Sequence, residues 1–131
     1  LIVTGTALIQ TGRLLPEALL ASLPAGLLIT AIVHANNMRD LGSDRDSGVK
    51  TLAGSLGLVR AKLFYSVLLF LPYALACASG KWPAAFAAAS LPAALKLDAM
   101  SVRGEFTPLV RKTAEFVAVF GLLFSVGLWI R

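Results

Sequence analysis

Residues 18–38 read ALLASLPAGLLITAIVHANNM and contain no Lys, Arg, Asp or Glu. Wound as an α-helix at 1.5 Å per residue, these 21 residues extend about 30 Å, which is the thickness of the hydrocarbon core of a bilayer. Pro24 lies inside the run, but proline is tolerated in membrane helices because neighbouring helices satisfy the freed carbonyl groups. The stretch therefore predicts a membrane-spanning helix.

Similar uncharged runs occur along the rest of the chain, with Pro72 and Pro92 inside two of them. Small residues in these runs suit close packing between helices. The shortest run ends at Lys96, whose long side chain can reach the interface. We predict an all-α, polytopic transmembrane helix bundle that forms a single membrane domain over residues 1–131. Its four to five spans lie near 1–12, 18–38, 63–80, 82–97 and 113–130.

The composition supports a membrane protein and argues against several other classes. Of the 131 residues, 57% are hydrophobic and 15% charged, and the mean hydropathy is +0.79. Soluble domains are about 45–50% apolar and about 25% charged. The single cysteine, Cys77, excludes a disulfide scaffold. The net charge of +5 does not indicate nucleic acid binding, because the cations do not form one stripe with interleaved aromatic residues.

The cations instead gather between apolar runs. The segments 39–62 and 96–112 are rich in Lys and Arg, whereas the connections near 10–17 and 80–83 each contain one cation. Basic segments on alternate sides of successive spans are typical of membrane proteins, with the basic side in the cytoplasm. We therefore predict that 39–62 and 96–112 are cytoplasmic and that the lipid bilayer is the immediate partner of the chain.

A polar stretch follows the longest run directly. Residues 36–50, NNMRDLGSDRDSGVK, hold three carboxylates, two amides and three cations. If the preceding helix continues, Asn37, Asp40 and Asp44 share one face, and the two carboxylates lie about 5–6 Å apart. The two negative charges repel each other unless a cation lies between the carboxylates. Carboxylate oxygens suit Mg²⁺, and Arg39 and Lys50 suit a diphosphate.

Two other interpretations remain open for this stretch. The first is a charged loop that only anchors two spans. The second is a cation-binding Asp-rich loop in a non-enzymatic membrane segment, such as a transporter or a scaffold. Asp46 points away from the other carboxylates on the same helix, and we leave it out of the candidate site. We expect His34 to be a packed, hydrogen-bonded residue rather than a proton carrier.

The pattern N-N-x-R-D-x-x-x-D-R-x-x-G-x-K-T-L-A at 36–53 resembles the second aspartate-rich motif of the UbiA superfamily of intramembrane prenyltransferases. It is most similar to the 1,4-dihydroxy-2-naphthoate polyprenyltransferase branch of menaquinone biosynthesis. Gly5-Thr6 and Gln10-Thr11-Gly12 resemble the residues that precede this helix in that branch. The resemblance covers essentially the whole chain and corresponds to the last four to five of about nine helices.

The resemblance implies a Mg²⁺-dependent enzyme that transfers an isoprenyl group from an allylic polyprenyl diphosphate to an aromatic quinone precursor, here 1,4-dihydroxy-2-naphthoate. It implies that Asp40 and Asp44 are the catalytic, metal-binding aspartates. It also implies an integral protein of the bacterial cytoplasmic membrane. The substrate-binding positions carried over from the family are Asn36, Asn37, Arg39, Arg45 and Lys50.

The first aspartate-rich motif of that superfamily is absent from this sequence, and Asp98 and Glu105 have neither its spacing nor its flanking residues. The chain begins at Leu1 inside an uncharged stretch. We therefore expect a piece of a longer enzyme, whose N-terminal half supplies the first motif. By itself this piece is expected to be unable to complete the metal–diphosphate site.

Overall fold

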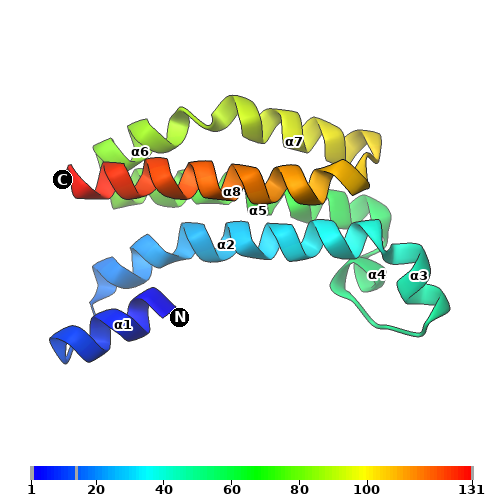
Figure 1. The fold of residues 1–131 in the computed structure, drawn as a ribbon, viewed down its shortest axis with the longest axis horizontal. Helices are drawn as coiled ribbons and strands as arrows, with labels where there is room; N and C mark the ends of the chain where they lie inside the picture. The colour runs from blue at the N-terminus through cyan, green and yellow to red at the C-terminus, as the bar shows by residue number, and fades with distance from the viewer. Residues whose placement is uncertain (1, 14, 131) are drawn as a thin grey trace.

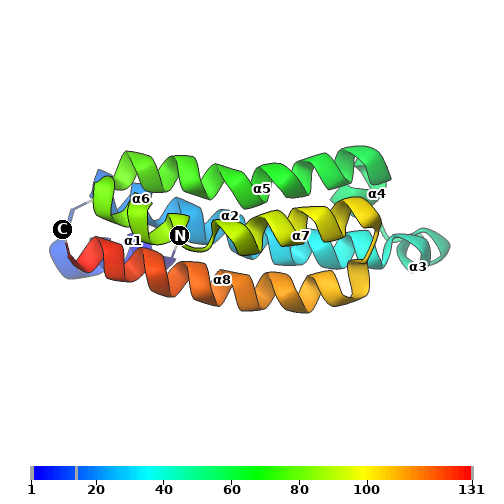
Figure 2. The same cartoon turned by 90° about the horizontal axis from the view of Figure 1, so that it is seen from above.

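The computed structural model describes residues 2–13 and 15–130, which form a bundle of helices without a β-strand (Figure 1). Helix α1 folds back beside the start of α2, and from above α7 lies between α5 and α8 (Figure 2). The helices are α1 (Ile2–Thr11), α2 (Pro16–Arg39), α3 (Leu41–Asp46), α4 (Leu52–Leu56), α5 (Leu58–Ser79), α6 (Lys81–Ala88), α7 (Leu91–Arg103) and α8 (Phe106–Trp129).

Two of the described helices, α2 and α5, are long and apolar enough to cross a membrane. The count rises to three if α6 and α7 are taken as one bent span. The prediction of an all-α membrane helix bundle is therefore confirmed. The predicted spans near 1–12 and 113–130 coincide with α1 and α8 and stay predictions.

The predicted span over 82–97 stays a prediction, and the structure divides this segment between two helices, α6 and α7, that meet at a bend of 51°. Helix α7 starts at Leu91 with Pro92 in its first turn, where the missing N–H of proline breaks no helical hydrogen bond. Ser90 accepts a hydrogen bond from the Tyr73 hydroxyl at 2.7 Å and donates to the carbonyl of Ala87 at 2.7 Å. These two contacts stabilise the bend.

The charged segment 96–112 is helical on both sides of one short turn. Helix α7 continues to Arg103 and α8 begins at Phe106. Gly104 makes the turn with φ of 80°, a left-handed conformation that glycine adopts without strain. Because Lys and Arg are good helix formers, a run of charged residues does not by itself end a helix. Such a run indicates only where the chain leaves the apolar part of the membrane.

Pro24 and Pro72 lie inside α2 and α5, as the membrane interpretation predicts, and the structure shows that both are buried. Small side chains line the contact between these two helices, and Ala31, Ala35 and Ala61 are fully buried there. They allow the backbones to approach closely.

A hydrogen bond joins α5 to α8 inside the core. The fully buried Tyr65 hydroxyl donates to the Thr113 hydroxyl at 2.6 Å, because that hydroxyl already gives its proton to the Leu109 carbonyl at 2.7 Å.

Helices α6 and α8 pack tightly at Gly127. A Cβ atom added to Gly127 would lie 2.7 Å from the Cα atom of Pro83 and 3.0 Å from the Trp82 carbonyl oxygen. Real Cβ atoms essentially never approach other atoms that closely. The contact therefore depends on the absence of a side chain at this position.

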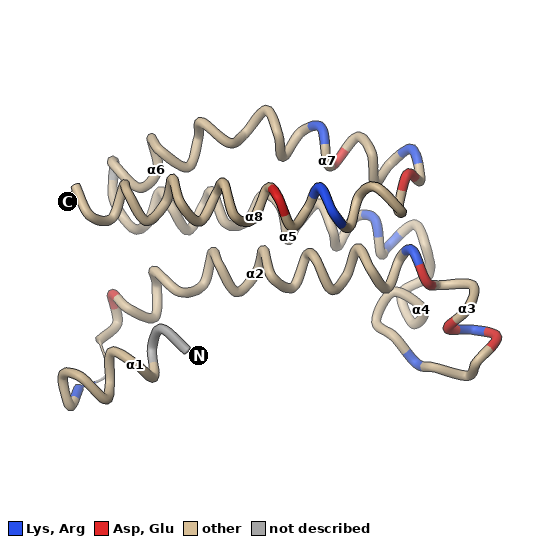
Figure 3. The backbone as a smooth tube through the Cα atoms, viewed as in Figure 1, with Lys and Arg blue, Asp and Glu red and all other residues tan. Residues whose placement is uncertain are grey.

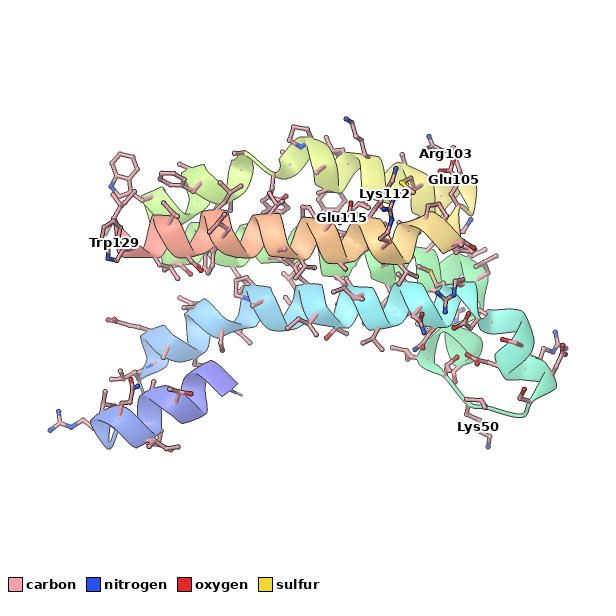
Figure 4. All side chains as sticks on the ribbon, in the orientation of Figure 1. Lys50, Arg103, Glu105, Lys112, Glu115 and Trp129 are labelled. Atoms are coloured by element: carbon pink, nitrogen blue, oxygen red, sulfur yellow. The ribbon has the colours of Figure 1, made fainter. Side chains whose placement is uncertain are left out.

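Most of the charged residues gather at the end of the bundle that carries α3, α4 and the turn between α7 and α8, and a few lie near α1 and the start of α2 (Figure 3). The two predicted basic segments lie at this same end. The opposite end carries Trp129, which is 87% exposed (Figure 4). This distribution agrees with the predicted common side for residues 39–62 and 96–112.

Candidate functional site

The polar stretch after α2 lines an open cavity of about 590 Å³ beside α3 and α4. The cavity lies at the charged end of the bundle, where α3 and α4 project beyond the long helices (Figure 1). Its polar side chains are Asp44, Arg45, Lys50, Thr51 and Ser55.

Asp40 lies at a break between two helices. Helix α2 ends at Arg39, α3 begins at Leu41, and Asp40 has φ of −91° and ψ of 8°. The assumption of one continuous helix is therefore wrong, since Asp favours helix ends over helix interiors. One part of the expected geometry survives, because the N–H of Asp44 donates to the Asp40 carbonyl at 2.8 Å and keeps these residues one turn apart.

The Asp40 carboxylate is paired with its neighbour in the chain. Arg39 donates through Nε to Oδ1 at 2.7 Å and through Nη2 to Oδ2 at 2.8 Å. The hydrogen bonds from Arg39 hold the pKa of Asp40 below its ordinary value. Neither residue lines the cavity.

We expect Arg39→Gln to raise the pKa of Asp40 toward its ordinary value of 3.8, since both charge-assisted hydrogen bonds are lost. The pairing lowers this pKa in the folded state, so it favours folding above pH 3.8 and is lost as the pH falls through the lowered pKa. A carbon-13 NMR titration of the Asp40 carboxyl group in the intact, metal-free protein measures the change. Arg45→Gln is the control and should leave the curve unchanged. Identical curves for both variants and the parent would contradict the pairing.

Three of the predicted site residues line the cavity: Asp44, Arg45 and Lys50. Helix α3 carries Asp44 and Arg45, and the N–H of Val49 donates to the Asp44 carbonyl at 2.8 Å, which turns the loop back. Lys50 lies on this loop, and its side chain extends away from the helices (Figure 4). Asp46 is exposed and outside the cavity lining, in line with its exclusion from the candidate site.

The other predicted residues lie apart from the cavity lining. Asn36 and Asn37 are half-buried on the last turn of α2, and the Asn36 carbonyl accepts the N–H of Asp40 at 3.0 Å. The structure therefore divides the predicted set. One group lines the cavity, and a second group, which includes Arg39 and Asp40, lies at the end of α2.

Two hydroxyl groups of the cavity were missed by the sequence interpretation. Thr51 caps α4 by accepting the N–H of Gly54 at 3.2 Å, and Ser55 donates to the Thr51 carbonyl at 3.0 Å. The signal was present in the sequence, because Thr directly before a short apolar segment is a common helix cap. Together with Asp44, Arg45 and Lys50, these hydroxyls can bind a phosphorylated ligand and a hard cation.

His34 is buried in α2 and 2% exposed. Its Nε2–H donates to the carbonyl of Ala61 at 2.9 Å, and its ring meets Phe64 edge-on with centroids 5.0 Å apart. The expectation of a packed, hydrogen-bonded histidine is confirmed. It ties the last turns of α2 to the first turn of α5, next to the polar stretch.

The sequence profile described as "UbiA prenyltransferase family" matches residues 1–120. The chain belongs to the UbiA prenyltransferase family. The match includes α2, α3 and α4, so the cavity residues lie within the family region.

Relatives from animals support this membership. The chain is 32% identical over 123 residues to UbiA prenyltransferase domain-containing protein 1 of Gallus gallus and of Homo sapiens. It is 35% identical over 122 residues to the Drosophila melanogaster homologue of that protein. These alignments cover 90–92% of this chain but 34–37% of the relatives, so the chain spans about a third of their length. No solved structure matches the chain.

Proposed function

We propose that the intact protein transfers an isoprenyl group from an allylic polyprenyl diphosphate to an aromatic acceptor. The observation that carries this proposal is the cavity beside α3 and α4, whose lining includes Asp44, Arg45, Lys50 and two hydroxyl groups. Family membership supports the same class of reaction. The rest of the enzyme would supply the first aspartate-rich motif on the opposite side of the substrate.

The donor set fits Mg²⁺. Among the described residues no group of three or more His, Cys, Asp or Glu could hold a metal ion. Magnesium in phosphate-transfer sites, however, commonly takes one or two protein carboxylates and completes its shell with water and phosphate oxygens. Asp44 would supply one carboxylate from the cavity, and Asp40, one helical turn earlier, would supply the second after leaving Arg39.

The residues of the chain would act mainly on the leaving group. When bound, Mg²⁺ supplies positive charge that stabilises the diphosphate. Arg45 and Lys50 would add charge-assisted hydrogen bonds to the diphosphate oxygens, and the Thr51 hydroxyl, which accepts the N–H of Gly54, would offer its own proton as a further donor. The C–O bond of the allylic diphosphate breaks and its electron pair leaves with the diphosphate. A ring carbon of the acceptor then gives an electron pair to the allylic cation to form the new C–C bond, and the ring regains aromaticity by releasing a proton, or CO2 where the attacked carbon carries the carboxylate.

For the acceptor we propose 1,4-dihydroxy-2-naphthoate, and with it a place in menaquinone biosynthesis. The support is the Asn36-Asn37-x-Arg39-Asp40 opening of the motif and the Gly5-Thr6 and Gln10-Thr11-Gly12 segments before α2. We further propose that the protein lies in a bacterial cytoplasmic membrane with α3 and α4 on the cytoplasmic side. The clustering of charges at that end supports this orientation (Figure 3).

An assay of the intact protein in liposomes tests the proposal. Farnesyl diphosphate and 1,4-dihydroxy-2-naphthoate are supplied with Mg²⁺, and the prenylated product is measured by mass spectrometry. We expect product with Mg²⁺, none with EDTA, and recovery when Mg²⁺ is restored. Replacing the acceptor with 4-hydroxybenzoate should lower the yield at least tenfold. Protein that is inserted but makes no product with either acceptor would favour a transporter or scaffold, and product in EDTA would contradict the metal site.

A further inference from the structure

A second hollow lies between α7 and α8, away from the cavity beside α3 and α4, and has a volume of about 260 Å³. Each helix contributes residues at the same spacing. Ala93, Lys96 and Met100 line it from α7, and Lys112, Glu115 and Val119 line it from α8. Residues three, four and seven apart lie on one face of a helix, so the two stripes form a continuous groove.

The floor of this groove is apolar and its rim is basic. Leu97, Met100 and Phe116 form the floor and are 3–5% exposed. Lys96 and Lys112 are exposed at the rim. A hydrocarbon floor beneath ammonium groups suits a ligand that is itself amphipathic.

The two ammonium groups lie at the same depth in the bundle. Lys96 is seven residues before Arg103, and Lys112 is six residues after Phe106. At 1.5 Å per residue, both Cα atoms lie about 10 Å from the turn between α7 and α8. Long lysine side chains at this depth can reach the interface between hydrocarbon and headgroups.

The acidic residue at the groove does not pair with these lysines. Glu115 Oε1 lies 3.6 Å from Arg111 Nη1, one turn earlier on α8. Figure 4 labels Lys112 and Glu115 side by side on this helix. No ion pair to Lys96 or Lys112 is formed by the described residues. Both positive charges are therefore available to an anionic ligand.

We propose that this groove binds one anionic phospholipid of the membrane, with the phosphate at Lys96 and Lys112 and an acyl chain along Leu97 and Phe116. Basic pockets between membrane helices on the cytoplasmic side bind anionic headgroups by the same chemistry. The bend between α6 and α7 helps to form the groove, because α6 packs closely on α8 at Gly127 whereas α7 continues in a different direction. The proposal does not depend on the transferase activity.

Native mass spectrometry of the intact protein tests this proposal, with dioleoyl phosphatidylglycerol and dioleoyl phosphatidylcholine as probes. We expect at least fivefold more retained phosphatidylglycerol than phosphatidylcholine. The double variant Lys96→Gln/Lys112→Gln should lose at least fivefold of the retained phosphatidylglycerol. The matched control Arg60→Gln/Arg103→Gln removes two exposed cations outside the groove and should retain the parent level.

Three further measurements distinguish a lipid site from surface charge. Lys96→Arg/Lys112→Arg keeps both charges and should retain phosphatidylglycerol. Ala93→Phe fills the groove without changing the charge and should reduce retention at least threefold, while inorganic phosphate should not compete. Two results would overturn the proposal: an equal loss of phosphatidylglycerol in both Gln double variants, or unchanged retention in Lys96→Gln/Lys112→Gln. Either result would favour another copy of the chain or the rest of the enzyme as the occupant of the groove.

Discussion

Asp44→Asn and Asp40→Asn, each made in the intact protein, are expected to lower isoprenyl transfer by about 10²–10³-fold. Asn keeps the size of the side chain but removes the negative charge that a hard cation requires. Insertion into the membrane should be unchanged, because Asp44 is only partly buried and Asp40 lies at a helix end. The rate of product formation at saturating Mg²⁺ measures the effect.

The chain offers a matched control in the same short helix. Asp46 lies two residues after Asp44, is exposed, and does not line the cavity. Asp46→Asn should leave the rate within about twofold of the parent, the small effect of a surface change. Equal losses in Asp44→Asn and Asp46→Asn would assign the effect to the net charge of α3. Undiminished turnover in both Asp44→Asn and Asp40→Asn would remove the metal assignment.

The long helices could be predicted from the sequence because hydrophobic length is a strong physical signal. The uncharged run 18–38 falls within α2 (Pro16–Arg39), and the run 63–80 falls within α5 (Leu58–Ser79) except for Gly80, which follows the last helical residue. Helix α2 extends beyond its run at both ends and α5 extends beyond its run at its start, because charged residues are compatible with a helix. The same fact explains why segment 96–112 turned out to be helical on both sides of one short turn.

The break between α6 and α7 depends on tertiary contacts that the sequence does not display. Pro24 and Pro72 lie within continuous helices, whereas Pro92 follows a bend. The difference lies at Ser90, whose hydroxyl bonds both the Tyr73 hydroxyl and the Ala87 carbonyl. Proline alone therefore does not identify the broken span, because its effect depends on whether a neighbour satisfies the freed backbone groups.

The candidate site was predictable as a stretch of chain but not as an arrangement of side chains. Spacing alone brought Asp40 and Asp44 within one turn of each other, and the backbone hydrogen bond between them keeps that relation. Spacing could not predict the ion pair between Arg39 and Asp40, because the side chains of adjacent residues do not face each other on a continuous helix. The break at Asp40 makes that pairing possible.

Gly127→Ala is expected to destabilise the intact protein by about 1–3 kcal/mol, the usual cost of adding a methyl group to a tightly packed contact. The added Cβ would meet backbone atoms of Pro83, 2.7 Å and 2.9 Å away, which cannot move aside as a flexible side chain can. Relief of the clash requires α6 to move away from α8. Thermal unfolding in detergent, followed by circular dichroism, measures the loss.

Gly121→Ala is the matched control, six residues earlier on the same helix. A Cβ atom at Gly121 would meet no atom within 4 Å. Alanine is the better helix former by about 1 kcal/mol, so this variant should equal the parent or exceed it in stability. Both substitutions add the same methyl group and the same gain in helix propensity. If Gly127→Ala lowers the stability and Gly121→Ala does not, the difference is therefore due to the contact with Pro83. Equal stability of both variants would mean that α6 does not pack against α8 at Gly127 in the intact protein.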